Sequence, residues 1–532
     1  MTGHEERYFE YLRRVAAPLT PAAAQNIRSI IDRTHWDEPE SAADLNNVAV
    51  LALIEAEIAH EAGARAASVE TALVSLEQSV SLDANPVNVA HLALVRALIG
   101  DHDAAVLTMI QRLADINSAV PGAGGTGERA DDCLVYWPID TPRVADRAAA
   151  RDLGRGRELR AALETGDACA RARMLLAAIA ARLVPILYNE ISQRLLHLAA
   201  HCHPDSPRIN LRLGIACVMS GQWEGLAYLR RALRLDPDSP LALQTLYLAM
   251  RTAGEDQRAS EWLRVARAAR AKAADSASWR WTELDGEPFS SVPFDGGMAL
   301  CVEASLRSLV TGVLLGEGDW FETEMELWRT QIQEGMTVID VGANVGVYTF
   351  SAAQRVGRAG RVYAVEPFSG CVRALEETCR VNRLSQVRVR AGAASDANRT
   401  ARLALRSASE MNTLEFGDAA SGNFEDVRCF TLDSLIEEEG LQRVDWLKID
   451  AEGHEMSVLH GAERLIRAFK PGILYENIAS GNWSNSSVAA HLRSLGYRLF
   501  RYRGYVRELA PVSLPEEVDA NLNVVALHED RT

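Results

Sequence analysis

Acidic residues follow several apolar runs in the C-terminal part of the chain, at the points where β-strands are expected to end. They are Asp340, Glu366, Asp396, Asp450 with Glu452, and Glu476 with the amide Asn477. The carboxyl ends of parallel strands meet along one edge of a sheet, and ligands bind at that edge. A single acidic residue at a strand end is commonly a helix cap or a solvated loop residue. A whole series of such strand ends favours a binding or catalytic site.

The run V-I-D-V-G-A-N-V-G-V-Y at residues 338–348 is typical of a strand, a glycine turn and the start of a helix. Its turn is G-x-N-x-G instead of the dinucleotide pattern G-x-G-x-x-G, and no Lys-Ser or Lys-Thr pair follows, so a phosphate cradle is not indicated. Asp340 would repel a pyrophosphate but suits a cationic amino group, and Glu366 at the end of the next strand suits the ribose hydroxyls. A ligand with a ribose, a cationic amino-acid tail and no phosphate is S-adenosylmethionine.

Strands and helices alternate after residue 336, which predicts an α/β fold with a parallel sheet covered on both faces. We expect strands near 337–341, 361–366, 387–391, 444–449 and 472–476, and helices near 346–356, 370–382, 454–467 and 485–495. A late pair of strands, 497–502 and 521–527, has no helix between its members and is expected to form an antiparallel hairpin at the sheet edge. Before the sheet, β-like runs are expected at 299–303 and 310–315, followed by a helical stretch at 320–333.

The first half of the chain is rich in Ala, Leu and Val at helical spacing, which predicts an all-α region. Two segments repeat at an offset of 33 residues, because Pro207 recurs as Pro240 (240 − 207 = 33) and Gly221 recurs as Gly254. This pattern of two helices, a glycine turn and a proline-marked exit resembles tetratricopeptide repeats. An irregular helical bundle with chance proline spacing is the alternative.

With 532 residues, the chain is long enough for more than one domain. The expected division is a helical domain at 1–118, a linker at 119–156, tetratricopeptide-like repeats at 157–275, a β/α lead-in at 276–335 and a Rossmann-like domain at 336–532. The glycine- and arginine-rich residues 119–156 favour a linker, although Tyr136 and Trp137 would also suit a lid over a groove. Two polar segments, 407–424 and 477–487, are candidate substrate loops or ordinary surface loops.

Several motifs occur in a fixed order between residues 290 and 527: G-D-W-F-E-T-E, V-I-D-V-G-A-N-V-G-V-Y-T, R-V-Y-A-V-E-P-F, V-D-W-L-K-I-D-A-E-G-H-E and N-L-N-V-V-A-L. Together they resemble the FkbM family of class I methyltransferases. The resemblance implies a seven-stranded Rossmann-like fold and S-adenosylmethionine as methyl donor. It also implies O-methylation of a hydroxyl on a sugar or glycan, a lipid or a secondary metabolite.

The resemblance assigns cofactor contacts to particular positions of this chain. Around the methionine end it places Asp340, Gly342, Asn344 and Gly346. Glu366, followed by Pro367, would hold the ribose, and Ser395 with Asp396 would meet the adenine. Glu322 would reach over the cofactor, although a solvated helix residue is an equal alternative there.

Methylation of an alcohol needs a group that removes the hydroxyl proton. The candidates are Lys448, Asp450, Glu452, His454 and Glu476. A lysine inside an apolar strand needs a carboxylate partner, so we expect Lys448 to pair with Asp450 or Glu476. Glu452 would equally cap the following helix, and a histidine such as His454 in a first helical turn is more often a surface or capping residue. Asp450, Glu452 and Glu476 also permit a divalent cation, but a metal is not assigned.

The net charge of −16 argues against nonspecific binding to nucleic acid. The eight cysteines include no CxxC pair, which fits reduced thiols, and no apolar run approaches the roughly 20 residues of a membrane span. We therefore expect a cytoplasmic protein whose acceptor is a small molecule, a glycan or a carrier-bound group. The helical repeats are expected to bind the acceptor or a protein partner, and a homo-oligomer is compatible with the sequence.

Two other functions remain open at the level of sequence. One is a nicotinamide-dependent oxidoreductase on a Rossmann sheet, which the absence of G-x-G-x-x-G disfavours. The other is a scaffold in which the repeats bind partners and the methyltransferase domain is degenerate. The methyl acceptor and the general base are not determined by the sequence.

Overall fold

A computed structural model describes residues 3–15, 18–111, 132–138, 160, 163–164, 168–180, 190–273, 277–284, 288–406, 409, 412–415, 423–479, 483–484, 486–513, 518 and 521–531. Parts of both expected substrate loops, 407–424 and 477–487, lie outside these residues. Of the expected linker at 119–156, only residues 132–138 are described. The contacts divide the chain into two compact units. Unit 1 comprises Met1–Ala242 and Gly504–Glu508, and unit 2 comprises Leu243–Arg503 and Leu509–Thr532. The domain boundaries given above remain a prediction.

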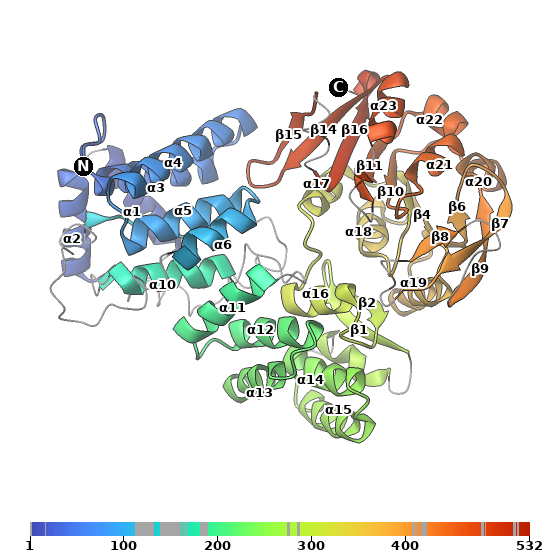
Figure 1. The fold of residues 1–532 in the computed structure, drawn as a ribbon, viewed down its shortest axis with the longest axis horizontal. Helices are drawn as coiled ribbons and strands as arrows, with labels where there is room; N and C mark the ends of the chain where they lie inside the picture. Colours follow the sequence, from blue (N-terminus) through green and yellow to red (C-terminus); the bar gives the residue numbers. More distant parts are fainter. Residues whose placement is uncertain are drawn as a thin grey trace. The chain divides into compact units, whose positions relative to one another are not determined.

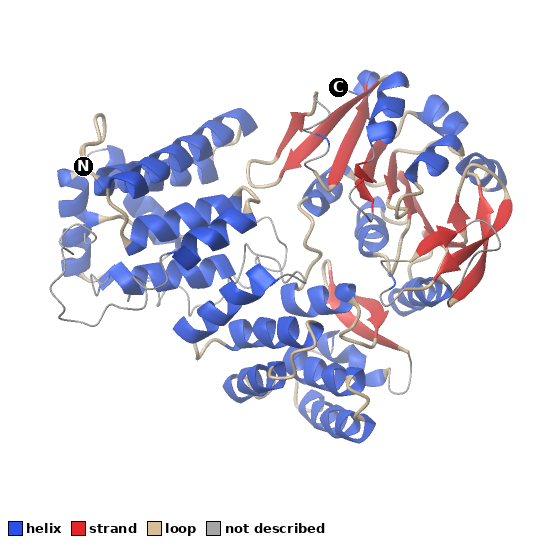
Figure 2. Ribbon diagram, in the orientation of Figure 1, coloured by secondary structure: helices blue, strands red, loops and turns tan. Residues whose placement is uncertain are grey.

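Unit 1 is built from helices, as the sequence predicts (Figures 1 and 2). Local signals explain where they begin: Ser41 with Asp44 and Asn85 with Asn88 form reciprocal capping boxes at the starts of α3 and α5. The described helices of this unit are α1 (Gly3–Val15), α2 (Pro21–Arg33), α3 (Ala42–Ile58), α4 (Ala62–Leu82), α5 (Pro86–Leu98), α6 (His102–Gln111), α10 (Ala168–Ala178), α11 (Glu190–Cys202), α12 (Pro207–Met219) and α13 (Gly225–Leu235).

The segment Asp132–Pro138 lies within the core of unit 1. Tyr136 and Trp137 belong to the same apolar cluster as residues of α1, α3 and α5, and only 0% and 8% of their surfaces are exposed. These two aromatic residues are therefore core residues of the helical unit. They do not form a lid over an open groove.

The repeated sequence pattern corresponds to helix starts and turns. Pro207 and Pro240 each begin a helix, α12 and α14 (Pro240–Thr252), and Gly221 and Gly254 both adopt φ +74° in the turns that follow. The second helix after the later turn is α15 (Asp256–Arg270). The assignment of these hairpins to the tetratricopeptide class stays a prediction.

The main sheet of unit 2 has, among the described residues, the strand order β15-β14-β16-β11-β10-β3-β4-β5. The five central strands from β11 to β5 are parallel, and β16 joins β11 and β14 in antiparallel pairs. This confirms the Rossmann-like α/β fold, with the short edge strand β15 added to the seven strands expected. The strands are β3 (Thr337–Val341), β4 (Arg361–Glu366), β5 (Val387–Ala391), β10 (Trp446–Ile449), β11 (Gly472–Glu476), β14 (Tyr497–Arg503), β15 (Glu508–Pro511) and β16 (Asn523–His528).

Helices pack on both faces of this sheet, as Figure 1 shows. Apolar residues such as Ile339, Ile449 and Ile473 face the helices of one layer, α20 (Leu432–Glu438), α21 (Glu455–His460), α22 (Glu463–Phe469) and α23 (Ser486–Ser494). On the other face, Trp328 makes edge-on ring contacts with Tyr348 and with Trp446 of β10. The elements there are α17 (Glu324–Gln331), α18 (Val347–Val356) and α19 (Ser369–Asn382).

Two expectations about local structure are wrong. Residues 310–315 are not β-like but lie in α16 (Leu309–Glu317), whose start is capped by Ser308 and whose end is the left-handed Gly318. This helix is buried on all sides, so its sequence lacks an amphipathic period. The helix expected at 454–467 is divided into α21 and α22 near Gly461, where the chain approaches Ser395 so closely that a Cβ would lie 1.9 Å from its carbonyl oxygen.

Smaller elements complete unit 2: the 3-10 turns η3 (Ala277–Glu283) and η5 (Glu529–Arg531), the hairpin β1 (Phe289–Phe294) and β2 (Met298–Glu303), the four-stranded sheet of β6 (Ala393–Ala394), β7 (Arg399–Ala404), β8 (Thr413–Glu415) and β9 (Phe424–Phe430), and the pair β12 (Ile478–Ala479) and β13 (Trp483–Ser484). Each of the eight cysteines is a free thiol.

Within the part of the chain that is described, no helix is both long and apolar enough to span a membrane.

Candidate functional site

A pocket opens at the carboxyl ends of β3, β4 and β10. Nine of the residues singled out in the sequence line it: Glu322, Asp340, Gly342, Asn344, Glu366, Pro367, Lys448, Asp450 and Glu452. The remaining lining residues are Val310, Trp320, Val341, Ala343, Val345, Val347, Tyr348, Val365, Ala393, Ala394, Leu403, Ser409, Asn412, Leu414 and Ala451. The structure therefore brings most of the predicted residues to one place.

Asp340 ends β3 with its side chain buried, 1% exposed, in the wall of this pocket. Its Oδ2 atom accepts a hydrogen bond of 2.6 Å from the Thr349 hydroxyl, whereas its Oδ1 atom has no partner among the described residues. Burial raises the pKa of Asp340, and the nearby Lys448 ammonium opposes this rise. A buried carboxylate oxygen without a donor is costly, so Oδ1 is suited to a cationic or hydrogen-bonding ligand group.

Lys448 supplies the central positive charge of the pocket. It lies opposite Asp340 in the parallel register of β10 and β3, and its Nζ atom is 2.7 Å from Asp450 Oδ2. The pairing with Asp450 expected from the sequence is thus confirmed. Burial by itself would lower the pKa of Lys448, but the carboxylates of Asp450, Glu322 and Asp340 raise it above its ordinary value. The lysine is held as an ammonium and is not a proton acceptor.

Glu322 faces the same pocket from the segment between α16 and α17. The Tyr348 hydroxyl donates a hydrogen bond to its Oε2 atom, and the Tyr348 ring lies 4.6 Å from the Lys448 Nζ atom. Burial raises the pKa of Glu322, Lys448 lowers it, and Asp450 raises it further. Its carboxylate is therefore more basic than an ordinary glutamate.

Glu366 binds the glycine turn through backbone groups. Its Oε2 atom accepts from the Asn344 N–H at 2.8 Å, and its Oε1 atom accepts from the Phe368 N–H at 2.8 Å. Burial raises the pKa of Glu366 to about 7, although these two hydrogen bonds lower it. Each carboxylate oxygen keeps a further lone pair for a ligand hydroxyl.

The two glycines of the turn are required by protein packing. At Gly342, φ is +74° and a Cβ would lie 1.7 Å from the Asp450 carbonyl oxygen. At Gly346, φ is +99° and a Cβ would lie 2.4 Å from the Phe350 ring. Gly346 does not line the pocket. The strand ends of β3 and β10 approach each other closely because position 342 carries no side chain.

Ser395, Asp396 and His454 form a separate cluster beside the pocket. His454 Nε2 lies 3.0 Å from Ser395 Oγ, which donates a hydrogen bond to Asp396 Oδ1 at 3.1 Å. Burial lowers the pKa of His454. The negative charge of Asp396 opposes this change, but the pKa stays below its ordinary value. None of the three lines the pocket as it is formed here. Their predicted roles in adenine binding and proton removal stay predictions.

Three acidic side chains converge at the ends of β10 and β11. Oxygen atoms of Asp450, Glu452 and Glu476 all lie within 4.8 Å of one another. Burial raises the pKa of Glu476, and the charges of Asp450 and Glu452 raise it further. The Lys448 ammonium already neutralises Asp450. Glu452 does not cap α21; instead Glu455 Oε1 accepts from the Ala451 and Gly453 N–H groups of the loop.

Comparison with protein families assigns this part of the chain. Residues 340–499 match the family described as the methyltransferase FkbM domain. We refer to this segment as the FkbM domain, after the family that it matches. The match supports S-adenosylmethionine as the cofactor. A search of curated proteins returned no match.

Solved structures similar to this chain include three methyltransferases. The FkbM methyltransferase of Methylobacillus flagellatus KT is 14% identical, with 40% of this chain and 52% of that chain covered and a TM-score of 0.25. A SAM-dependent methyltransferase of Aquifex aeolicus is 21% identical, with coverages of 39% and 89% and a TM-score of 0.22. An O-methyltransferase of Bacillus cereus in complex with SAH is 15% identical, with coverages of 40% and 83% and a TM-score of 0.25. The alignment with the Methylobacillus protein therefore spans only about half of that protein's length.

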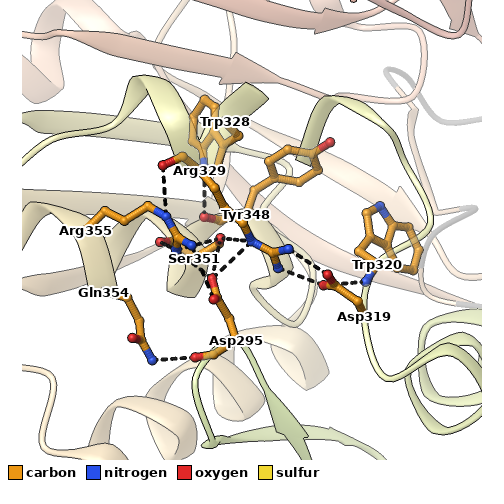
Figure 3. A network of polar contacts seen from close by, with 9 residues as sticks. All are labelled: Asp295, Asp319, Trp320, Trp328, Arg329, Tyr348, Ser351, Gln354 and Arg355. Atoms are coloured by element: carbon orange, nitrogen blue, oxygen red, sulfur yellow. Dashed lines mark hydrogen bonds and ion pairs between the residues drawn. The ribbon is translucent and has the colours of Figure 1, made fainter. Parts of the chain in front are cut away.

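The residues just before the FkbM domain are fixed by the charge network of Figure 3. Arg329 of α17 forms a two-pronged ion pair with Asp319, at 2.6 and 2.7 Å, and both side chains are at most 7% exposed. Asp319 also accepts from the Trp320 N–H at 2.8 Å. Because Trp320 and Glu322 line the pocket, this ion pair fixes the chain where it enters the site.

The same network continues into α18, the helix that follows the glycine turn. Asp295 Oδ2 accepts hydrogen bonds from Arg329 Nε at 3.2 Å and from the Ser351 hydroxyl at 2.7 Å (Figure 3). Arg355 Nη1 donates to the same oxygen at 2.6 Å. The carboxylate of Asp295 is buried, which raises its pKa, but these partners lower it overall. Two arginines and two aspartates thus bind α17, α18 and the β1–β2 turn together.

Sequence reasoning overlooked Tyr348, Thr349 and Trp320. Tyr348 and Thr349 lie in the first turn of α18 and contact Glu322 and Asp340, respectively. The sequence did indicate these two residues, because polar residues in the first helical turn after the glycine loop must lie near the end of the preceding strand. Trp320 gave no such signal, since its position depends on the buried Asp319–Arg329 pair.

Proposed function

We propose that this chain transfers a methyl group from S-adenosylmethionine to a hydroxyl group of a sugar or glycan, a lipid or a secondary metabolite. The observation that carries the proposal is the buried Oδ1 atom of Asp340, a residue of the pocket wall, which has no hydrogen-bond donor among the described residues. The acceptor class is what the resemblance to the FkbM family implies, and the O-methyl specificity is supported by the carboxylates around this pocket, which could take up a hydroxyl proton. The acceptor itself stays open.

The chemistry of the pocket fits the parts of this cofactor. Asp340 Oδ1 would accept from the ammonium of the methionine moiety, and the free lone pairs of Glu366 would accept from the ribose hydroxyls. Ala393, Ala394, Leu403 and Leu414 form an apolar part of the wall that suits a flat base. No lysine or glycine-rich cradle for a phosphate is needed.

When bound, S-adenosylmethionine supplies a methyl group on a sulfonium that is already activated, so the chain must align the acceptor and take up its proton. We assign proton uptake to Glu322, a carboxylate of the pocket wall whose pKa is raised by burial. Tyr348 holds the Glu322 carboxylate by its hydroxyl, and Lys448 compensates the negative charges of Glu322, Asp340 and Asp450. Lys448 and Tyr348 are positioning residues in this account.

The experiment that tests this function compares metabolites of cells that produce the wild-type chain with those of a deletion strain. Untargeted mass spectrometry should find products that differ by one methyl group, and NMR of such a product should place the methyl on oxygen. Complementation with Glu322→Gln should leave the products unmethylated, because the amide cannot accept the hydroxyl proton. Methyl groups found on nitrogen or carbon, or methylation by Glu322→Gln at the wild-type rate, would refute the proposal.

A further inference from the structure

Residues 133–138 run through the core of unit 1 without belonging to a helix or a sheet, and we call them a strand because their backbone groups alternate between two edges. In the described part of the chain it pairs with no other strand. Its five central side chains, from Cys133 to Trp137, are at most 8% exposed. The backbone of a buried strand must still find hydrogen-bond partners, and here helix side chains provide them.

One edge of this strand is bound by α1. The Tyr8 hydroxyl donates to the Val135 carbonyl at 2.9 Å and accepts from the Val135 N–H at 3.1 Å. The Tyr11 hydroxyl repeats both contacts with the carbonyl and the N–H of Trp137. Tyr8 and Tyr11 are three residues apart on α1, so both side chains lie on the same face of this helix.

The opposite edge is bound by α3 and α5. Asn47 Oδ1 accepts from the Leu134 N–H at 2.6 Å, and Asn46 Nδ2 donates to the Leu134 carbonyl at 3.1 Å. His91 Nε2 of α5 accepts from the Tyr136 N–H at 3.1 Å. The other His91 nitrogen, Nδ1, lies 2.7 Å from Asn46 Oδ1, so it donates there and Nε2 is left to accept. Burial lowers the pKa of His91 to about 3, which keeps the ring neutral as this arrangement requires.

Two further contacts hold the beginning of the strand. Asn47 Nδ2 donates to the Asp132 carbonyl at 2.9 Å, and the buried Arg171 of α10 donates to the Cys133 carbonyl at 3.1 Å. Odd and even residues of the segment thus present their backbone groups to opposite edges, as in a β-sheet. Side chains of four helices replace the two neighbouring strands.

We propose that α1, α3, α5 and α10 form a binding channel for an extended polypeptide, which recognises the backbone, and that residues 132–138 of this chain are its resident occupant. The channel fits a peptide with free N–H groups at four consecutive positions and apolar or aromatic side chains, as in L-V-Y-W. A protein partner that used this channel would present such a strand and displace the resident one. This inference is independent of the methyltransferase function.

The first test is amide hydrogen exchange in the full chain carrying Tyr8→Phe and Tyr11→Phe. The amides of Val135 and Trp137 should exchange faster by about tenfold or more, because they lose their acceptors. Those of Leu134 and Tyr136, bound by Asn47 and His91, should change much less. Tyr228→Phe removes a hydroxyl elsewhere in unit 1 and should leave all four unchanged. An equal acceleration at all four amides, or none, would overturn backbone recognition.

The second test asks whether the occupant can be supplied as a separate molecule. Residues 132–138 are replaced in the full chain by glycine and serine, and a synthetic D-C-L-V-Y-W-P peptide is added. The peptide should bind one to one and raise Tm, or restore helicity if the variant is unfolded. Methylation of the peptide nitrogens of Val135 and Trp137 should weaken binding about tenfold or more, and the wild-type chain should bind the peptide far more weakly. Absence of binding and of refolding, or equal binding of the methylated peptide, would contradict the proposal.

Discussion

Lys448 Nζ lies 2.7 Å from Asp450 Oδ2 in a site where Asp340 and Glu322 add two more carboxylates. Replacement by methionine, Lys448→Met, would leave these acids without their buried cation. Removing one partner of a buried pair costs about 3–5 kcal/mol, so we expect a loss of this size in the free energy of unfolding, measured with urea at neutral pH. Lys470→Met breaks the exposed pair with Asp530 and should cost less than about 1 kcal/mol. Equal losses in the two variants would refute the central role of Lys448.

The Asp319–Arg329 pair should control cofactor affinity at a distance. In Asp319→Asn, Arg329 keeps its contact with Asp295, but Trp320 and Glu322 lose their fixed position. We expect S-adenosylhomocysteine to bind about tenfold more weakly by calorimetry, equivalent to about 1.4 kcal/mol. The matched control is Arg355→Gln, which alters the same network without touching Asp319, and its affinity should stay within about twofold of wild type. An unchanged affinity in Asp319→Asn would show that the pair does not position the pocket.

A side chain at Gly342 should damage the junction of β3 and β10. In Gly342→Ala the added Cβ would overlap the Asp450 carbonyl oxygen, so β10 must shift. This adds to the free-energy cost of placing alanine at φ +74°. The matched control is Gly335→Ala, where φ is +81° but no atom lies within 4 Å of the added Cβ. Thermal unfolding should show a loss of about 1–2 kcal/mol for the control, from the backbone alone, and a clearly larger loss for Gly342→Ala. Similar losses in both would contradict the close approach.

As the pH rises through 7, ionisation of Glu366 should lower the stability of the fold and strengthen cofactor binding. Its pKa is raised from 4.5 to about 7 in the folded state, so its contribution to stability is fully present below pH 4.5 and is lost as pH rises through 7. The shift corresponds to up to about 3 kcal/mol. In Glu366→Gln this pH dependence should disappear, and the variant should exceed wild type in stability at pH 8 while binding S-adenosylhomocysteine more weakly. A variant with the pH profile of wild type would rule out Glu366 as the titrating group.

The central strands and the acidic strand ends could be predicted because local rules determine them. The apolar runs before Asp340, Glu366 and Asp450 are parallel strands, and their carboxyl ends share one edge in any sheet of this type. The position of the segment at 132–138 could not be predicted, because it depends on packing between residues far apart in the sequence. The aromatic residues of the segment at 132–138 resemble a lid in sequence, but their strand is held by residues more than a hundred positions away, such as Tyr8. The role of Trp320 depends instead on a buried ion pair between Asp319 and Arg329, ten positions apart, which no local pattern announces.

The glycine turn also shows what a motif leaves open. Its pattern indicates a ligand site, and the pocket lies there. The space at Gly342 and Gly346, however, is filled by the Asp450 carbonyl and the Phe350 ring. The glycines therefore shape the wall that a ligand meets.

The most direct measurement is calorimetric titration of the purified chain with S-adenosylhomocysteine, which carries the same ammonium and ribose as the methyl donor. We expect saturable one-to-one binding to wild type and no saturable binding of NAD. Binding to Asp340→Asn should be at least about tenfold weaker, because a charge-assisted contact is lost. Saturable binding of NAD without binding of S-adenosylhomocysteine, or an Asp340→Asn variant with wild-type affinity, would contradict these expectations.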